Sequence, residues 1–184
     1  EGEAPAEGND FIFAVSDGMG GANAGEFASR SALQSMTDLI ARQFHVRAGD
    51  SPSDREDRLR DFFQRAHEEV QKMGRHYLEC RGMGATLSVG WFSGDSLHIG
   101  HVGDSRIYHL PAEGPMIQLT EDHTEAGRLR RQGRINEREG RIHPTRHLLE
   151  RSIGAQPHAV EPQIATIPIA RGDRFIFCTD GIID

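Results

Sequence analysis

The stretch Phe11-Ile12-Phe13-Ala14-Val15-Ser16-Asp17-Gly18-Met19-Gly20-Gly21 decides how the rest of this chain can be interpreted. It opens with a short apolar run that is rich in strand formers and too short for a helix, so we expect a buried strand. The strand ends at Asp17, and the Asp and Gly residues after Ser16 form a turn that lets a ligand approach the backbone closely. A carboxylate in this position can hold a hard cation, although an Asp-Gly turn by itself requires none.

The same pattern recurs twice later in the chain. The segment Phe175–Gly181 is again an aromatic strand followed by Asp180 and Gly, and Leu97–Ser105 ends in the Gly-flanked Asp104. If the fold brings these strand ends together, the carboxylates repel one another unless cations lie between them. Oxygen ligands without Cys or clustered His favour Mg or Mn over Zn.

Composition limits the classes of function. A chain of 184 residues can build one domain with a substantial core. The net charge of -7 argues against nucleic-acid binding, and no apolar run approaches a membrane span or a secretory signal. Lys72 is the only lysine, and no Gly-Lys-Ser/Thr occurs, which excludes a Walker-type phosphate loop. Two cysteines, Cys80 and Cys178, provide no disulfide framework, so we expect a reducing, cytoplasmic location.

The sequence of the first part of the chain predicts a connector and two helices. Residues 1–10 are rich in Glu, Gly, Ala and Pro and are expected to be a mobile connector. A helix is expected from Ala24 to Gln43. The next helix is expected to begin with a capping box formed by Ser53 and Glu56. Its inward positions, spaced by three and four, are Leu59, Phe62, Phe63, Ala66, Val70, Met73 and Tyr77.

From Arg81 the period changes to that of strands joined by hairpins, which indicates antiparallel sheet. A hairpin turn is expected at Ser93-Gly94-Asp95. The expected strands are Ala85–Phe92, Leu97–Val102, Arg106–Leu110, Met116–Leu119, Val160–Ile169 and Arg174–Thr179. Thr86 and Leu87 lie in the first of these strands, and we expect both to be structural, with Leu87 buried.

The flap segment, Glu121–Arg151, differs in composition, with eight arginines and six acidic residues. A helix is expected over Glu125–Gln132, ending at Gly133, and Asn136 is expected to cap another turn. One interpretation is a solvated helical excursion. The other is a flap beside an active site, with some arginines facing an anionic substrate; the sequence favours neither.

Five motifs now point to a family. They are Asp17–Gly21, Gly84-Ala85-Thr86-Leu87, Gly103-Asp104-Ser105-Arg106, Leu119–Thr124 and Cys178-Thr179-Asp180-Gly181. The order and the separations of these motifs resemble those of the metal-dependent protein serine/threonine phosphatases of type 2C (the PPM family). Met19 and the Arg-rich segment before Leu148–Gly154 look like the bacterial members.

The resemblance implies an α+β fold, a four-layer α/β/β/α sandwich of two antiparallel sheets flanked by helices. Residues 1–184 would form a single phosphatase domain that is incomplete at both ends. The resemblance also implies a centre of two Mn or Mg ions, with a possible third. Asp17 resembles the bridging ligand, the Gly18 carbonyl a second contact, and Asp180 a further ligand. Asp104 and, less closely, Asp184 resemble ligands of the third ion.

The implied activity is hydrolysis of phosphoserine and phosphothreonine in proteins. A hydroxide bridging the two metals, positioned through Asp17, would attack phosphorus, because metal binding can lower the pKa of water to about 7. No nucleophilic side chain is needed, so Cys80 and Cys178 are not candidates. A phosphorylated protein is the expected substrate, and a Ser/Thr kinase acting on it is the expected signalling partner.

The chain departs from the family pattern in three places. The family has an Arg and an acidic metal ligand on a strand before the Asp17 strand, and nothing in Glu1–Asp10 reads as that strand. The family also has a later strand carrying Asp-Asn, which would follow Asp184. Met19 stands where many eukaryotic members have His, and a Met side chain cannot act as a general acid.

Two other readings stay open from the residues alone. A haloacid-dehalogenase-type phosphatase also has Asp after an apolar strand, but it needs a second Asp where Met19 stands, a Lys, and a parallel sheet. The other reading is a catalytically incompetent phosphatase-like domain that binds phosphoproteins or metal.

Overall fold

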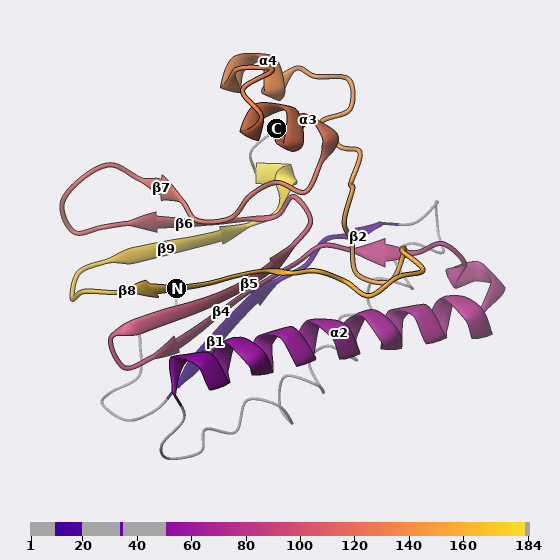
Figure 1. Cartoon of the computed structure of the whole chain (residues 1–184), viewed down its shortest axis with the longest axis horizontal. Coiled ribbons are helices and arrows are strands. Elements are labelled where there is room, and N and C mark those ends of the chain that lie inside the picture. Colours follow the sequence, from indigo (N-terminus) through magenta and orange to yellow (C-terminus); the bar gives the residue numbers. More distant parts are fainter. Residues whose placement is uncertain (1–9, 20–33, 35–50, 183–184) are drawn as a thin grey trace.

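Two stacked antiparallel sheets, with a long helix across one outer face, form the body of the molecule (Figure 1). The structure, a computed structural model, describes residues 10–19, 34 and 51–182. Strands form where the alternating pattern of the sequence predicts them, and their boundaries agree with the expected ones to within a few residues. The expected helix from Ala24 to Gln43 lies outside the described residues except for Gln34.

The first sheet has the strand order β1–β4–β5–β8. These strands are β1 (Phe11–Val15), β4 (Leu87–Ser93), β5 (Ser96–Val102) and β8 (Gln163–Pro168). All neighbours pair antiparallel, and β4 and β5 meet at Ser93↔Ser96, so Gly94 and Asp95 form the expected hairpin turn. Because β1 and β5 both pair antiparallel with β4, they run toward the same end of the sheet.

The second sheet has the order β7–β6–β9, formed by β6 (Arg106–Leu110), β7 (Ile117–Gln118) and β9 (Arg174–Cys178). A short ladder joins β2 (Gly18–Met19) to β3 (Gly84–Ala85). The expected strand Ala85–Phe92 is therefore split at Thr86. Every strand pair in the described part of the chain is antiparallel, which excludes the haloacid-dehalogenase alternative because that fold requires a parallel sheet.

The N-terminal cap of helix α2 (Pro52–His76) is Ser51, two residues before the expected cap, so the Ser53/Glu56 capping box is wrong. The observed box is formed by Ser51 and Asp54, because Pro52 fits the first helical position, where its missing N–H costs nothing. Tyr77 is the other correction: it is the C-terminal cap and is 52% exposed, because the helix ends before the periodic pattern does.

Two apolar cores hold the layers together. One lies between α2 and the first sheet, and its members include Leu59, Phe62, Phe63, Leu87 and Trp91, all at most 1% exposed. The other lies between the two sheets, around Leu97, Ile99 and Ile107. Gly100 allows the helix to approach closely, because a Cβ atom there would lie 2.5 Å from the ring of Phe63. The burial of Leu87 is confirmed.

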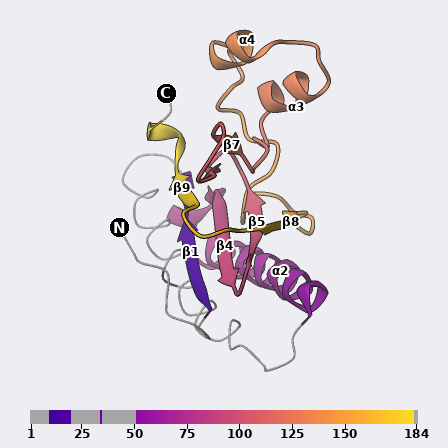
Figure 2. The same cartoon turned by 90° about the vertical axis from the view of Figure 1, so that its left-hand side faces the viewer.

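The two helices of the flap segment project from the sheets, at the end toward which β5 and β9 run (Figures 1 and 2). The segment contains α3 (Glu125–Arg131), capped by Thr124, and α4 (Glu137–Arg141), which begins with a capping box of Asn136 and Glu139. Both helices are where the sequence places them. The short 3-10 turns η1 (Leu78–Cys80) and η2 (Asp180–Ile182) complete the described elements.

The described residues supply three layers of the expected four: α2, the first sheet and the second sheet. Residues 1–9 of the expected connector lie outside them, while Asp10 is held by a hydrogen bond of 2.6 Å from the Trp91 indole. None of the helices in the described part of the chain is long and apolar enough to span a membrane.

Candidate active site

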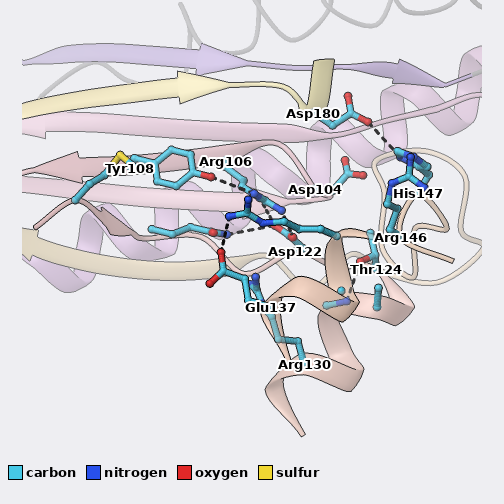
Figure 3. Close-up of a pocket in the computed structure, with 16 residues that line it drawn as sticks. Asp104, Arg106, Tyr108, Asp122, Thr124, Arg130, Glu137, Arg146, His147 and Asp180 are labelled. Carbon is cyan, nitrogen blue, oxygen red and sulfur yellow. Dashed lines mark hydrogen bonds and ion pairs between the residues drawn. The ribbon is translucent and has the colours of Figure 1, made fainter. Parts of the chain in front are cut away.

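Three carboxylates lie at one end of the sandwich, each delivered by the end of a strand. Asp17 follows β1, Asp104 follows β5, and Asp180 follows β9 and opens η2. These strands run toward the end that carries the flap segment (Figure 1). Asp104 and Asp180 line the same pocket (Figure 3). The recurring pattern of strand, Asp and turn therefore brings the three side chains into one region.

The electrostatics of these side chains reflect their mutual proximity. Burial, followed by the charge and hydrogen bonding of Asp180, raises the pKa of Asp17, and a hydrogen bond from the Gly18 backbone opposes this effect. Burial, followed by the charges of Asp180 and Asp122, raises the pKa of Asp104 to about 7. Like charges that are partly desolvated disfavour ionisation, and a nearby cation removes this penalty. The site therefore fits a hard cation in charge and in ligand type.

The carboxylates do not enclose an ion by themselves. Among residues 10–19, 34 and 51–182, no three His, Cys, Asp or Glu side chains converge closely enough to bind one metal. Mg and Mn prefer about six oxygen ligands, so backbone carbonyl groups, water or residues outside these ranges would supply the remainder. Gly18 lies beside Asp17 in β2, and Asp184 lies outside the described residues.

A group of hydroxyls supports the Asp17 turn from the neighbouring strand. The Asp17 N–H donates to the Thr86 hydroxyl at 2.9 Å, and the Thr86 N–H donates to the Asp17 carbonyl at 2.8 Å. The Ser16 hydroxyl donates to the Thr86 carbonyl at 2.6 Å. The Thr86 hydroxyl also lies 2.5 Å from the Ser105 hydroxyl, next to Asp104.

A buried histidine pair lies behind the Asp104 loop. His101 and His123 stack with ring centroids 4.9 Å apart. Burial lowers the pKa of His101 to about 4, and burial followed by the charge of His101 lowers that of His123 to about 3. Both rings are therefore neutral near pH 7. The Gly103 N–H donates to His123 Nδ1 at 3.1 Å, so His123 holds this loop in place.

A pocket of about 550 Å³ extends from Asp104 and Asp180 toward the flap segment (Figure 3). The second sheet supplies Arg106, Tyr108 and Gln118 to its wall, and Met116 stands beside them. The flap segment supplies the facing wall. Its contributions there are Asp122, Thr124, Ala126, Gly127, Arg130, Glu137, Gly140, Arg141, Arg146 and His147. The flap segment thus borders the candidate site, as the second interpretation of its sequence requires.

Most cations near the pocket already have anionic partners. Arg106 forms a bidentate pair with Asp122 at 2.8 and 2.6 Å. Arg128 pairs with Glu150 at 2.7 Å, and Arg141 pairs with Glu137 at 2.6 Å. His147 Nδ1 lies 3.7 Å from Asp180 Oδ2, so a flap side chain reaches a candidate metal ligand.

Arg130 differs from these residues. It lines the pocket, and within the described part of the chain no ion pair or side-chain hydrogen bond of its guanidinium is found. It lies on the side of the pocket away from Asp180 (Figure 3). Arg130 can therefore contact a ligand that extends from the carboxylates along the flap.

Sequence reasoning missed the Arg106–Asp122 pair and the Thr86–Ser105 contact. All four residues lie in the motifs quoted above, so the motifs contain them but do not reveal that they touch. The signal that could have found them is a polar or charged residue next to apolar strand residues, such as Thr86 before Leu87 and Arg106 before Ile107. Only the fold shows which of these polar residues meet.

Comparison with known proteins gives a consistent result. Residues 4–184 match the family model described as "Protein phosphatase 2C". The serine/threonine protein phosphatase PstP of Mycobacterium tuberculosis is 34% identical over 183 residues, which cover 94% of this chain and 32% of PstP. The serine/threonine phosphatase stp of Listeria monocytogenes is 31% identical over 174 residues, covering 95% of this chain and 67% of stp. This chain therefore spans about a third of the length of PstP.

Solved structures show the same likeness. A serine/threonine phosphatase of S. agalactiae superposes with a TM-score of 0.79 at 28% identity, covering 97% of this chain and 76% of that one. The catalytic domain of PstP in complex with two manganese ions superposes with a TM-score of 0.70 at 30% identity, covering 98% of this chain and 74% of that one. The α+β fold predicted from the sequence is confirmed by these neighbours.

Proposed function

Because the chain belongs to the protein phosphatase 2C family, we propose that the protein hydrolyses phosphoserine and phosphothreonine in proteins, using Mn or Mg. The observation that carries this proposal is the grouping of Asp17 with Asp104 and Asp180, the last two of which line one end of a pocket. Carboxylates that repel one another in a partly buried region cost free energy, and bound cations would stabilise them.

The proposed ligands are Asp17, the Gly18 carbonyl and Asp180 for two central ions, with Asp104 and Asp184 for a third. Bound cations would polarise the phosphoryl group and activate a water to attack phosphorus. The chain's own contribution is to hold the acidic groups together and to shape the pocket. Asp17 has the central role in this assignment because it resembles the bridging ligand of the family, and the charge of the neighbouring Asp180 helps to raise its pKa.

The pocket beside the flap segment would receive the peptide around the phosphorylated residue. Its walls mix ionic groups with Tyr108 and Met116, which suits an extended polypeptide better than a free phosphate ion. Arg106 is committed to Asp122, so it supports the pocket wall rather than binding the phosphoryl group. We include residues 121–151 as the flap of a single phosphatase domain in the proposal.

The remaining parts of the proposal concern the cellular setting. A Ser/Thr kinase would phosphorylate the proteins that this phosphatase dephosphorylates. A cytoplasmic location is supported by two free cysteines, Cys80 and Cys178, both buried and unlinked. The relatives PstP and stp carry names of serine/threonine phosphatases, which agrees with this assignment.

The test is hydrolysis of a phosphothreonine peptide by the full-length natural protein during a Mn titration. We expect activity to rise with Mn, to disappear in excess chelator and to resist thiol reagents. Asp17→Asn should remove nearly all turnover, because it removes a charge from the centre of the site. Asp95→Asn is the matched control, because Asp95 is an exposed carboxylate in the β4–β5 turn. Rapid hydrolysis in excess chelator would contradict the proposal.

The same assay separates the remaining alternative, a domain that binds phosphoproteins without hydrolysing them. A phosphopeptide that binds in the presence of Mn but is not turned over would favour this reading.

A further inference from the structure

We propose that Thr86 and Ser105 form a positioning link that holds the Asp17 turn and the Asp104 loop at a fixed separation, and thereby sets the affinity of the site for divalent cations. This inference rests on the proposed function, because it concerns the same carboxylates. The sequence led us to expect a purely structural Thr86. The contacts of its hydroxyl assign it a more specific task.

The first step is the position of Thr86 in the strand ladder. The register continues from Val15↔Ser88 to Gly18↔Ala85 without an inserted residue, which places Asp17 opposite Thr86. In a regular rung, the Asp17 N–H would donate to the Thr86 carbonyl. Here it donates to the Thr86 hydroxyl at 2.9 Å, and the carbonyl accepts from the Ser16 hydroxyl instead. A side chain has therefore replaced a backbone group at the candidate ligand.

The second step is the contact on the other side of the same hydroxyl. The Thr86 and Ser105 hydroxyl oxygens lie 2.5 Å apart, and both residues are at most 2% exposed. Ser105 directly follows Asp104. A hydroxyl can accept two hydrogen bonds and donate one, so Thr86 can serve Asp17 and Ser105 together. The link thus joins two loops that are distant in sequence.

The third step is the shape of the Asp104 loop. Gly103 has a φ of +113°, and a Cβ atom there would lie 2.6 Å from Thr86 Cβ. The loop therefore packs directly against Thr86, and only Gly permits this approach. On its other side the loop is bonded to His123, at 3.1 Å from the Gly103 N–H to Nδ1 and at 2.8 Å from the His123 N–H to the Gly103 carbonyl.

These contacts have a consequence for cation binding. Carboxylates that repel one another separate unless the backbone holds them, and a separated set binds a cation less tightly. A single buried hydroxyl of Thr86 joins the backbone N–H of Asp17 to the side-chain hydroxyl of Ser105. Its removal should loosen the site while leaving the apolar core in place.

The test is the dissociation constant for Mn, measured by calorimetry on the metal-free, full-length natural protein. Thr86→Val keeps the shape of the side chain and removes the hydroxyl. We expect it to weaken Mn binding about tenfold, as the loss of a buried hydrogen bond at the site implies. Thr86→Ser keeps the hydroxyl and should restore binding to near the natural value.

Two further variants make the result specific. Thr120→Val is the matched control, because Thr120 is 3% exposed and its hydroxyl also accepts a backbone N–H, from Ile107 at 3.1 Å. It should lower the melting temperature without changing Mn affinity. Ser105→Ala cuts only the link to the Asp104 loop. The double variant should bind Mn about as weakly as Thr86→Val alone, because both substitutions break the same contact between Thr86 and Ser105.

The outcomes are distinct. Unchanged Mn affinity in Thr86→Val, or equal weakening in Thr120→Val, would overturn the inference while leaving the proposed function intact. If Thr86→Val does not fold, Ser105→Ala decides, since it leaves the bond to Asp17 in place: weakened Mn binding supports the link, and unchanged binding overturns it. A natural protein that neither binds Mn nor hydrolyses phosphopeptides would overturn the proposed function itself, and this inference with it.

Discussion

Arg106 and Asp122 form a bidentate ion pair, with distances of 2.8 Å from Nε to Oδ1 and 2.6 Å from Nη2 to Oδ2. The pair joins β6 to the first residues of the flap segment. Both side chains are largely buried, at 21% and 11% exposed, and Gln118 donates a further hydrogen bond to Asp122. The geometry is that of a planar fork meeting a carboxylate, which only Arg provides. The pair therefore fixes how the flap segment meets the second sheet.

Breaking this pair should destabilise the protein. We expect Asp122→Asn to cost about 2–3 kcal/mol, somewhat less than a fully buried pair, because it leaves the Arg106 charge without its anion. Arg106→Lys should also be destabilising, since an ammonium cannot reproduce the fork. Urea denaturation measures the effect. Arg60→Ala removes an exposed pair with Glu56 and Asp57 and should cost less than about 1 kcal/mol.

Truncation of Leu87 tests the core between α2 and the first sheet. Leu87 is 1% exposed, so Leu87→Ala should cost about 2–5 kcal/mol through lost burial and the remaining cavity. Leu78→Ala is the control, because Leu78 is 78% exposed and should change stability by about 0.5 kcal/mol or less. Similar melting temperatures for the two variants would contradict the observed placement of β4.

The pKa of His101 predicts part of the pH dependence of stability. Burial lowers it to about 4 in the folded protein, so the unfolded chain binds more protons between about pH 6.5 and pH 4. Stability should therefore fall as the pH decreases through this range, by about 2 kcal/mol at pH 5. The raised pKa of Asp104 acts in the opposite direction, since protonation favours its folded form.

The contribution of His101 is therefore measured by comparing how much stability the natural protein and a His101 variant each lose on acidification. Denaturation of the natural protein and of His101→Gln should be compared at pH 7.5 and pH 5 in excess chelator. The variant will be less stable at the higher pH, because it alters the bonds to Ser88 and to the Gly103 and Glu121 carbonyls. Its loss of stability on acidification should be smaller. An equal loss in both proteins would show that His101 does not titrate as described.

Arg130→Ala should impair use of peptide substrates. Arg130 lines the pocket, and among the described residues its guanidinium has no ion pair or side-chain hydrogen bond, so it can attract an acidic residue near the phosphorylated one. Loss of about 1 kcal/mol of such attraction raises KM about fivefold for an acidic phosphopeptide. The KM for p-nitrophenyl phosphate, which cannot reach along the flap, should not change. Arg134→Ala, outside the pocket lining, is the control.

The sequence by itself determined the features that depend on neighbours along the chain. Alternating apolar residues and the Ser93–Asp95 turn predicted antiparallel strands, because side-chain direction in a strand repeats every two residues. The three Asp residues at strand ends indicated a metal site, provided that the fold brings those strand ends together. Local pattern was less reliable at the boundaries of α2, where Pro52 moved the capping box to Ser51.

Only the tertiary structure decided which polar residues meet. Thr86 and Ser105 are 19 residues apart, and Arg106 and Asp122 are 16 apart, yet each pair is in direct contact. It also decided which arginines of the flap segment line the pocket, among them Arg130, Arg141 and Arg146. Such contacts depend on how strands from distant segments are registered and how a loop packs on them. Periodicity along the chain shows which face a residue occupies, but it does not encode the partner that folding brings to that face.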